Sequence, residues 1–222
     1  MRRILRENGL SIVMLTLFIF AVVGQSITGY HEYNDDQKQH GQAQLAFVEY
    51  LGSGHFVEAI FENWESEFLQ MGLYVLLTAF LYQKGSPESK KLDEKELVDS
   101  DPSKSKRRRK DAPWPVRQGG LILKVYQNSL SLALFLLFII SMSLHAAGGA
   151  RLYSEEQRAH GSPPVSTIEY LGTSRFWFES FQNWQSEFLS VGMLVILSIF
   201  LRQKGSPESK PVDSPHSKTG GD

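Results

Sequence analysis

Two long apolar segments dominate the pattern of hydrophobic and polar positions along the chain. They run from residue 10 to 27 and from residue 130 to 150, and each is almost free of charged side chains. About 20 residues at a rise of 1.5 Å per residue give a helix the length it needs to cross a bilayer core of about 30 Å. The pattern therefore predicts transmembrane helices at about residues 8–28 and 128–149.

Two shorter apolar runs follow, at residues 68–82 and 188–201. About 15 residues cover only about 22 Å, so a helix that crosses the bilayer must include the more polar turns that precede each run. This reasoning predicts a second pair of transmembrane helices at about residues 63–83 and 183–203. The predicted fold class is an all-α membrane protein with four transmembrane helices.

The chain also aligns with itself at an offset of 120 residues. Residues 8–90 match residues 128–210 without a gap, with about 36 of 83 positions identical, which indicates an internal duplication. Each copy contains two predicted crossings, so both copies enter the membrane in the same direction. We therefore predict two parallel helical-hairpin repeats, residues 1–90 and 121–204. Because the second copy lies in mid-chain, the first helix is interpreted as a retained helix and not as a cleaved signal peptide.

The placement of Lys and Arg predicts the orientation. Of the 23 basic residues, 19 lie before the first predicted helix, between the second and third, or after the fourth. Only Lys38, Arg151, Arg158 and Arg175 lie in the two opposite loops. By the positive-inside rule, the N-terminus, the C-terminus and the central loop are expected in the cytoplasm of a multi-pass protein.

Two polar segments are predicted to be disordered because they contain too little apolar surface to offset their ordering entropy. They are a charged cytoplasmic linker at residues 91–120 and a cytoplasmic tail at residues 205–222. The linker contains a basic run that either contacts anionic lipid headgroups or acts only as a topology determinant. This run consists of Lys106, Arg107, Arg108, Arg109 and Lys110.

Each predicted extracytoplasmic segment carries a Tyr-x3-Gln-x2-His-Gly pattern that ends at His40-Gly41 in the first copy and at His160-Gly161 in the second. This spacing places Tyr, Gln and His on one helical face, and the Gly suits a helix C-cap. One hypothesis is a metal site shared by His40 and His160. The favoured alternative is that each His only interacts with the helix dipole, because no established metal-binding spacing is present. No cofactor is expected.

Short amphipathic helices are predicted to lead from these segments into the second helix of each copy. Trp64 and Trp184 then fall near the water interface, where indole is favoured. Packing between the repeats is the alternative role for either Trp.

An intramembrane polar cluster is the most informative prediction. If the second helix of each copy begins near Asn63 and Asn183, the carboxyl groups of Glu67 and Glu187 lie below the membrane surface. Polar side chains in lipid cost several kcal/mol, so these groups are expected to face one another inside the assembly. Gln25 and His145 on the first helices are predicted at the same depth.

Composition narrows the function classes. A formal net charge of −1 gives no reason to expect a nucleic-acid partner, and the absence of cysteine excludes disulfides, thiolate metal sites and cysteine nucleophiles. The expected partners are the lipid bilayer and either further copies of the chain or an unknown membrane protein. The polar cluster is interpreted first as a hydrogen-bonded structural latch and second as a proton or cation path. A membrane-embedded hydrolase is the third and least favoured reading, because no nucleophile or complete metal set accompanies the carboxyl groups.

Several blocks resemble an uncharacterised bacterial membrane protein family that carries a domain of unknown function. The resemblance rests on Arg6 to Ser11, Glu49-Tyr50-Leu51, Asn63 to Gly72 and Arg202 to Ser206. It implies a location in the bacterial inner (plasma) membrane and brings no catalytic residues. The expected role is therefore non-enzymatic, structural or accessory, with a small transporter or channel for protons or cations as the alternative.

Overall fold

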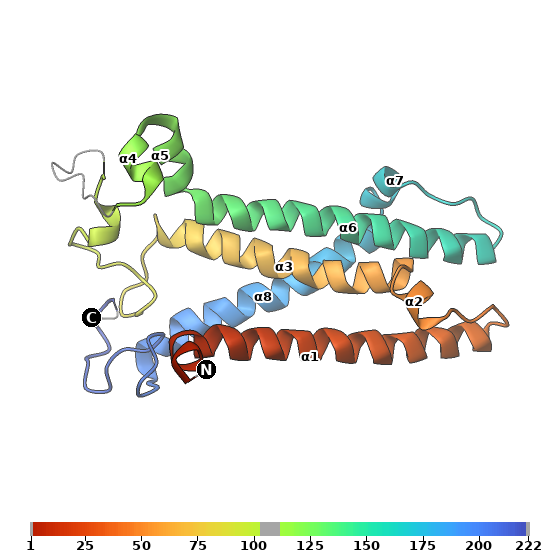
Figure 1. The fold of residues 1–222 in the computed structure, drawn as a ribbon, viewed down its shortest axis with the longest axis horizontal. Helices are drawn as coiled ribbons and strands as arrows, with labels where there is room; N and C mark the ends of the chain where they lie inside the picture. The colour runs from red at the N-terminus through yellow and green to blue at the C-terminus, as the bar shows by residue number, and fades with distance from the viewer. Residues whose placement is uncertain (1, 103–111, 221–222) are drawn as a thin grey trace. The chain divides into compact units, whose positions relative to one another are not determined.

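The computed structural model describes residues 2–102 and 112–220, and every regular element within them is helical (Figure 1). This confirms the all-helical class for the described part of the chain. The elements in chain order are α1 (Arg2–Gln39), α2 (Phe47–Tyr50), α3 (Gly54–Thr78), a 3-10 turn η1 (Leu97–Asp99), α4 (Trp114–Gln118), α5 (Gly120–Gln127), α6 (Ser129–Ala159), α7 (Thr167–Leu171) and α8 (Ser174–Phe200).

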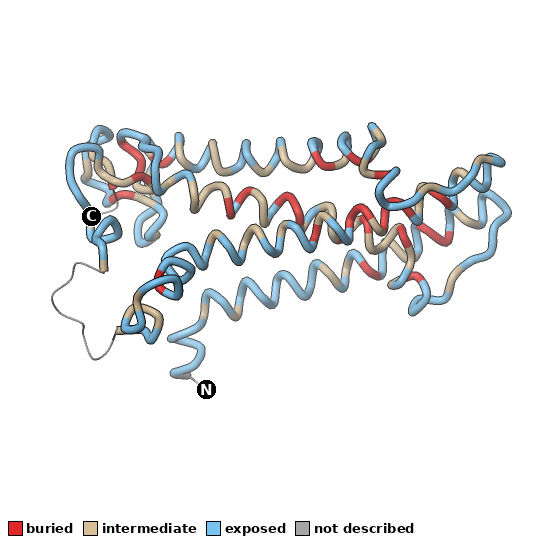
Figure 2. Tube along the Cα trace, turned by 90° about the horizontal axis from the view of Figure 1, so that it is seen from above, coloured by how far each residue is buried: buried red, intermediate tan, exposed pale blue. Residues whose placement is uncertain are grey.

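Three of the described helices are long and apolar enough to cross a membrane. They are α1, α6 and α8, whose most apolar 18-residue stretches are only 6%, 17% and 6% buried by protein. Figure 2 shows the helix that begins at the N-terminus exposed along most of its length. A continuous exposed surface of Leu, Ile and Phe is unfavourable in water and favourable in hydrocarbon, so these helices indicate a membrane protein.

Helix α3 has 25 residues but is not among the three apolar helices. It carries four glutamates, Glu58, Glu62, Glu65 and Glu67, which lower its mean hydropathy. Its bounds differ from the predicted span of 63–83, because the helix begins nine residues earlier and ends at Thr78. At its start, the Ser53 hydroxyl accepts a hydrogen bond from the Phe56 amide at 3.2 Å, as an N-cap does.

The chain forms two compact units, and each is described by itself. The first unit comprises Met1–Phe61 and Ser143–Phe176, and the second comprises Glu62–Met142 and Trp177–Asp222. The first unit therefore holds α1, α2, α7 and the adjoining ends of α3, α6 and α8. The second unit holds the remaining parts of these three helices and the segments that follow α3 and α8.

In the first unit, α1 and α6 end in the same way. Gly41 and Gly161 adopt positive φ angles of 69° and 74°, a conformation that glycine tolerates without strain. The amides of Gln42 and Ser162 then donate to carbonyls five residues earlier, both at 2.8 Å. This is the glycine C-cap that the sequence pattern predicts.

The segment after each cap is tied back to its helix. The Asn34 side chain donates to the Leu45 carbonyl at 3.0 Å and accepts from the Leu45 amide at 2.8 Å. The Ser154 hydroxyl makes the same two contacts with Val165, at 3.1 and 3.0 Å. A paired contact of this kind fixes both backbone groups of the connecting residue and positions the short helices α2 and α7.

In the second unit, the described parts of the linker and the tail have defined structure. The described part of the predicted linker contains η1 and α4. The tail contains Lys210, which is only 1% exposed and whose ammonium donates to the carbonyls of Pro215, His216 and Lys218 at 3.0–3.2 Å. One cation that satisfies several carbonyls holds this polar segment together without an apolar core. The predicted basic run of Lys106, Arg107, Arg108, Arg109 and Lys110 lies outside the described residues.

Candidate functional site

Two buried carboxyl groups of α3 are the main candidate site residues. Glu58 is 6% exposed and Glu65 is fully buried, and a spacing of seven residues places them on one face of the helix. The sequence prediction singled out a different face of α3, and its residues Glu67 and Asn63 are exposed in the structure. Glu65 and Glu67 are two residues apart, which corresponds to a rotation of about 200° around the helix axis, so their side chains lie on different faces.

In the first unit, Glu58 belongs to a buried polar cluster with Tyr170 and His145. The Tyr170 hydroxyl, which is fully buried, donates to Glu58 Oε1 at 3.0 Å. A ring nitrogen of His145, also fully buried, lies within 4.8 Å of a Glu58 oxygen. His145 packs against Phe176 in a tilted arrangement with a ring-centroid distance of 4.9 Å, which constrains the imidazole plane. Helices α3, α6 and α7 thus meet in a closed polar core.

Glycines allow the backbones to approach this cluster closely. A Cβ added at Gly149 would lie 2.6 Å from the Tyr170 hydroxyl and 2.7 Å from Glu58 Oε1. A Cβ at Gly148 would lie 2.6 Å from the Glu58 amide nitrogen, and one at Gly54 would lie 2.8 Å from the Gly148 carbonyl oxygen. Any larger residue at these positions would force α3 and α6 apart, as expected for small residues at a membrane helix interface.

A second tyrosine makes the corresponding contact near the start of the chain. Tyr50 is 1% exposed, and its hydroxyl lies 3.2 Å from His55 Nδ1 and close to Gly29. Burial and the nearby carboxylate of Glu32 raise the pKa of Tyr50 to about 12, so its hydroxyl stays protonated at neutral pH. Tyr50 and Tyr170 both come from the repeated Glu-Tyr-Leu-Gly block, a signal that the sequence offered and that we did not interpret as a site.

In the second unit, Glu65 accepts a hydrogen bond from Ser180. The Ser180 hydroxyl of α8 is fully buried and lies 2.8 Å from Glu65 Oε1. Glu187, which was predicted to face inward with Glu67, is half-buried and experiences the charge of the exposed Glu67. Glu65 therefore makes a buried hydrogen bond between α3 and α8.

The other predicted members of the cluster have separate environments. Gln25 is exposed and donates to the Ala59 carbonyl at 3.4 Å. Asn183 is half-buried and donates to the Glu179 carbonyl of its own helix at 3.2 Å. Of the six predicted residues, only His145 is fully buried and adjacent to a buried carboxyl group.

The two predicted interface tryptophans are both half-buried. Trp184 packs in an aromatic cluster, with ring-centroid distances of 5.4 Å to Phe181, 6.3 Å to Trp177 and 6.4 Å to Phe138. These four rings all belong to the second predicted repeat, residues 121–204, so the contacts are packing within that repeat and not packing between the repeats.

The two histidines proposed as weak metal ligands, His40 and His160, line one cavity of about 310 Å³ in the first unit. The sequence pattern placed them at the ends of two different helices, and the fold brings them to the same cavity. Glu32, Glu155 and Arg175 are among the other lining residues.

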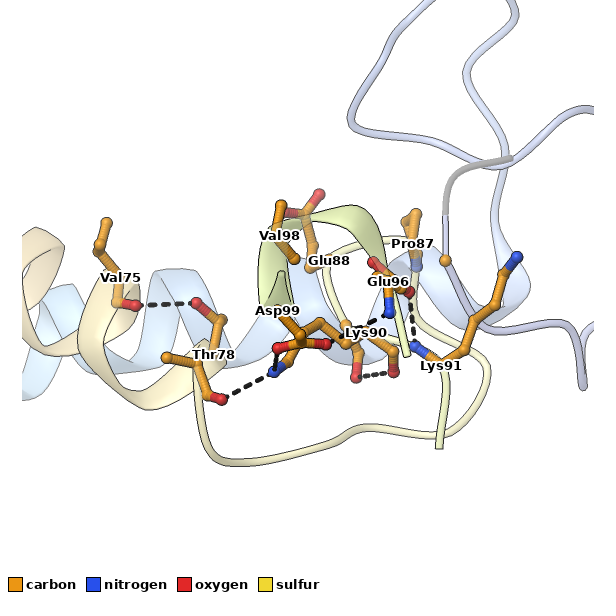
Figure 3. Close-up of a pocket in the computed structure, with 12 residues that line it drawn as sticks. Val75, Thr78, Pro87, Glu88, Lys90, Lys91, Glu96, Val98 and Asp99 are labelled. Carbon is orange, nitrogen blue, oxygen red and sulfur yellow. Dashed lines mark hydrogen bonds and ion pairs between the residues drawn. The ribbon is translucent and has the colours of Figure 1, made fainter. Parts of the chain in front are cut away.

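The second unit contains a larger cavity of about 570 Å³, shown in Figure 3. The Lys90 ammonium points to the Asp99 carboxylate at 2.7 Å and also donates to the Ala79 carbonyl at 2.9 Å. The hydrogen bond to Asp99 raises the pKa of Lys90, and the same bond lowers the pKa of Asp99. Because these charges neutralise one another, this cavity offers little net charge to a ligand.

Glu88 also lines this cavity and interacts with a second carboxyl group. The Tyr74 hydroxyl donates to Glu88 Oε2 at 2.9 Å, and Glu208 shares a hydrogen bond with Glu88. Burial and then the neighbouring carboxyl of Glu208 raise the pKa of Glu88 against the opposing effect of the Tyr74 hydrogen bond. Glu88 and Glu208 come from the two copies of the Gln-Lys-Gly-Ser-Pro-Glu-Ser-Lys motif.

These features define an all-helical protein with three helices that are able to cross a membrane and with carboxyl groups buried between helices. Residues 1–221 match the family described as "Domain of unknown function (DUF6766)", and the chain belongs to this family. No curated protein and no solved structure matched the chain. The family description assigns no activity, so the function has to be inferred from the site.

Proposed function

We propose that the chain is an integral membrane protein that crosses the bilayer four times and has a structural or accessory, non-enzymatic role. The fourth crossing would be α3, whose 25 residues span about 37 Å. Its hydropathy is low because of its glutamates, but Glu58 and Glu65 are enclosed by protein. Carboxyl groups that are enclosed by protein do not contact lipid, so they add no free-energy cost of lipid exposure. Mean hydropathy therefore underestimates how well α3 suits a bilayer.

The proposal includes two parallel hairpin repeats with both termini and the linker in the cytoplasm. Support comes from hydrogen bonds that recur 120 residues apart, such as those of Asn34 and Ser154 to their connecting segments. The Lys and Arg distribution supports the orientation. The family resemblance of the sequence blocks supports a bacterial inner membrane.

One observation carries the structural role: the cluster of Glu58, Tyr170 and His145 is closed. Gly148 and Gly149 let the helix backbones approach until no side chain would fit between them. None of these three residues lines the cavities of about 310 and 570 Å³. A buried cluster joined by the Tyr170–Glu58 hydrogen bond and bounded by close glycine contacts acts best as a latch that fixes how helices pack.

A second candidate function is proton handling, and the arrangement of the two α3 carboxyl groups favours it. Glu58 and Glu65 follow one helix face, and a hydroxyl group donates to each. Carboxyl groups inside membrane helices commonly mark proton relays. This candidate requires proton movement across the bilayer, which the latch does not.

Flux and stability measurements separate the two candidates. The purified chain would be reconstituted into liposomes with a trapped pH-sensitive dye, beside a Glu58→Gln/Glu65→Gln variant and the exposed-site control Glu67→Gln. The latch predicts no proton flux above that of empty liposomes, and it predicts that Tyr170→Phe lowers the unfolding midpoint while the control does not. Flux that is present in the wild type and lost only in the double variant would establish proton handling instead.

The four-span topology has its own test, because the chain contains no cysteine and single thiols can be added without background. Ala43 and Ser100 are exposed and lie on either side of α3. In intact cells, an impermeant thiol reagent is expected to label Ala43→Cys and to leave Ser100→Cys unlabelled until the membrane is opened. Equal labelling of both variants would mean that α3 does not cross.

A further inference from the structure

The short helix α5 carries an exposed apolar face that the proposed latch does not use. It lies in the second unit, contacts α4, and is separated from the long apolar helix α6 by one residue, Asn128. An apolar face is unfavourable in water, so it indicates a surface that contacts something apolar. This face, called the α5 apolar face below, consists of four exposed residues, Leu121, Ile122, Val125 and Tyr126.

The α5 apolar face is continuous and points away from the protein. At about 100° per residue, its four side chains cover about 140° of the helix surface. The opposite side carries Leu123, which is 6% exposed, and Gln127, which is exposed. Leu123 therefore packs against the protein, and the larger part of the apolar surface of α5 stays free.

The residues around this face have the chemistry of a membrane surface. Helix α4 adds Trp114, which is 55% exposed, and indole and phenol groups are favoured at the interface between lipid and water. Arg117 and Lys124 are both exposed, and residues 112–128 contain no Asp or Glu. An apolar face flanked only by cations is complementary to a bilayer with anionic headgroups.

A bend at Asn128 separates α5 from α6. Asn128 has φ −113° and ψ 8°, outside the helical range, and its side chain donates to the Lys124 carbonyl at 2.8 Å. Figure 1 shows α5 turned away from the line of α6 at this point. The same device occurs 120 residues earlier, where Asn8 has φ −128° and ψ 19° and donates to the Ile4 carbonyl at 3.2 Å. In both places, a short helix bends just before a long apolar one.

The lengths of the two helices place α5 near the membrane surface. Helix α6 has 31 residues and spans about 46 Å, so it exceeds the bilayer core of about 30 Å without α5. Helix α5 has 8 residues and spans about 12 Å, and it is joined to α6 two residues before the apolar run that begins at Leu130. It therefore stays close to the headgroup layer, which is about 5–8 Å thick on each side.

From this arrangement we propose that α4 and α5 form an interfacial anchor in the leaflet that α6 enters. The α5 apolar face and Trp114 insert among the lipid headgroups, and Arg117 and Lys124 contact anionic phospholipid. The anchor continues the exposed apolar surface of α6, whose most apolar stretch is only 17% buried by protein. The inference rests on the proposed function, because it requires that α6 crosses the bilayer.

Spin labels on single added cysteines test the anchor in the full-length chain, which has no cysteine of its own. The labelled protein would be reconstituted into liposomes of phosphatidylcholine and phosphatidylglycerol. Collisions of each label with oxygen, which concentrates in lipid, and with a water-soluble nickel chelate then report its depth. Ile122→Cys probes the α5 apolar face, Gln127→Cys is the matched control on the opposite side of the same helix, and Leu136→Cys is the reference within α6. All three positions are exposed, so the labels do not disturb packing.

We expect the ratio of oxygen to nickel collisions to be about threefold higher at Ile122→Cys than at Gln127→Cys, and highest at Leu136→Cys. A high ratio at Leu136→Cys with equal, low ratios at the other two positions would overturn the anchor and leave the crossing intact. A low ratio at Leu136→Cys would refute the proposed crossing and the anchor together. A label at Ile122→Cys that neither reagent reaches would mean that a second copy or another protein covers the face, which also overturns the anchor.

The lipid charge has a separate test. In liposomes of phosphatidylcholine alone, the collision ratio at Ile122→Cys is expected to fall about twofold, because the two cations lose their anionic partners. The variant Arg117→Gln/Lys124→Gln, labelled at the same position, should give the lower ratio in both kinds of liposome. A ratio that depends neither on phosphatidylglycerol nor on these two residues would overturn the contact with anionic phospholipid.

Discussion

Replacing Gly149 by Ala tests whether close helix packing holds the buried cluster together. The new methyl group would lie 2.5 Å from Tyr170 Cε1, 2.6 Å from its hydroxyl and 2.7 Å from Glu58 Oε1. None of these neighbours is the free end of an exposed side chain, since Tyr170 is fully buried and Glu58 is 6% exposed. The methyl group can only be accommodated if the helices separate or if the hydrogen bond between Tyr170 and Glu58 breaks.

The expected cost follows from opposing effects. Overpacking a dense core costs about 1–3 kcal/mol. Leaving a buried hydrogen-bonding group without its partner also costs about 1–3 kcal/mol. The two costs do not add in full, because a movement that breaks the hydrogen bond relieves the overpacking. The change from Gly to Ala inside a helix returns about 0.5–1 kcal/mol. We therefore expect Gly149→Ala to lower the free energy of unfolding by about 1–3 kcal/mol.

The chain supplies two matched controls for the same substitution. Gly192 in α8 has no heavy atom within 4 Å of an added Cβ, so Gly192→Ala is expected to raise the free energy of unfolding by about 0.5–1 kcal/mol. Gly72 is intermediate, with Phe135 ring atoms at 3.3 and 3.4 Å, and its substitution is expected to be nearly neutral. The three substitutions therefore have a predicted order of stability, and the change in the free energy of unfolding reverses its sign between Gly149→Ala and Gly192→Ala.

Unfolding by sodium dodecyl sulfate in mixed micelles, followed by tryptophan fluorescence, measures these differences for the three variants under one condition. Far-ultraviolet circular dichroism before unfolding confirms that each variant is helical. The reasoning fails if Gly149→Ala is as stable as wild type, or if Gly192→Ala is the most destabilised of the three. Either result would mean that α3, α6 and α7 do not approach as closely as the glycines indicate.

Two further predictions concern the second unit. Because burial and the carboxyl of Glu208 raise the pKa of Glu88, the folded state holds this proton more tightly than the unfolded chain does. The resulting stability is fully present below about pH 4.5, the ordinary pKa of this carboxyl group, and is lost as the pH rises through the raised pKa of the folded state. Glu88→Gln should therefore flatten the fall in the unfolding midpoint that the wild type shows as the pH rises above the folded-state pKa. Separately, Lys210→Met leaves three carbonyls without their shared donor, and hydrogen exchange of residues 211–220 should become at least tenfold faster, whereas the exposed control Lys204→Met should not change it.

The sequence was sufficient to predict helices and their caps, because these depend on local patterns. Continuous apolar runs predicted the cores of α1 and α6, and glycines after a helical face predicted the C-caps at Gly41 and Gly161. The end of α3 was harder to predict, since its last turns are followed by Ala79, whose carbonyl accepts from Lys90 eleven residues later. An apolar run alone does not reveal such a distant cap.

The contacts of Lys210 in the tail also could not be predicted from composition. Residues 205–222 contain almost no large apolar side chains, which is the usual sign of disorder. Within the described part of the tail, the buried ammonium of Lys210 donates to three carbonyls of the same segment. That arrangement depends on the path of the backbone and not on average composition.

The buried face of α3 was missed for a different reason, which bears on where function should be sought. Repetition directed attention to Glu67 because Glu187 matches it, whereas the buried Glu58 and Glu65 are matched by Phe178 and Gln185. A spacing of seven that joins Glu58, Glu65 and Gly72 on one helix face was the available signal. Two like carboxyl groups enclosed in a low dielectric cannot both ionise cheaply, so the proposed duplication would favour a chain that keeps each buried carboxyl in one copy only. On this reasoning, residues that the two copies share build the common architecture, as Tyr50 and Tyr170 do, and residues in which they differ determine the chemistry of the core.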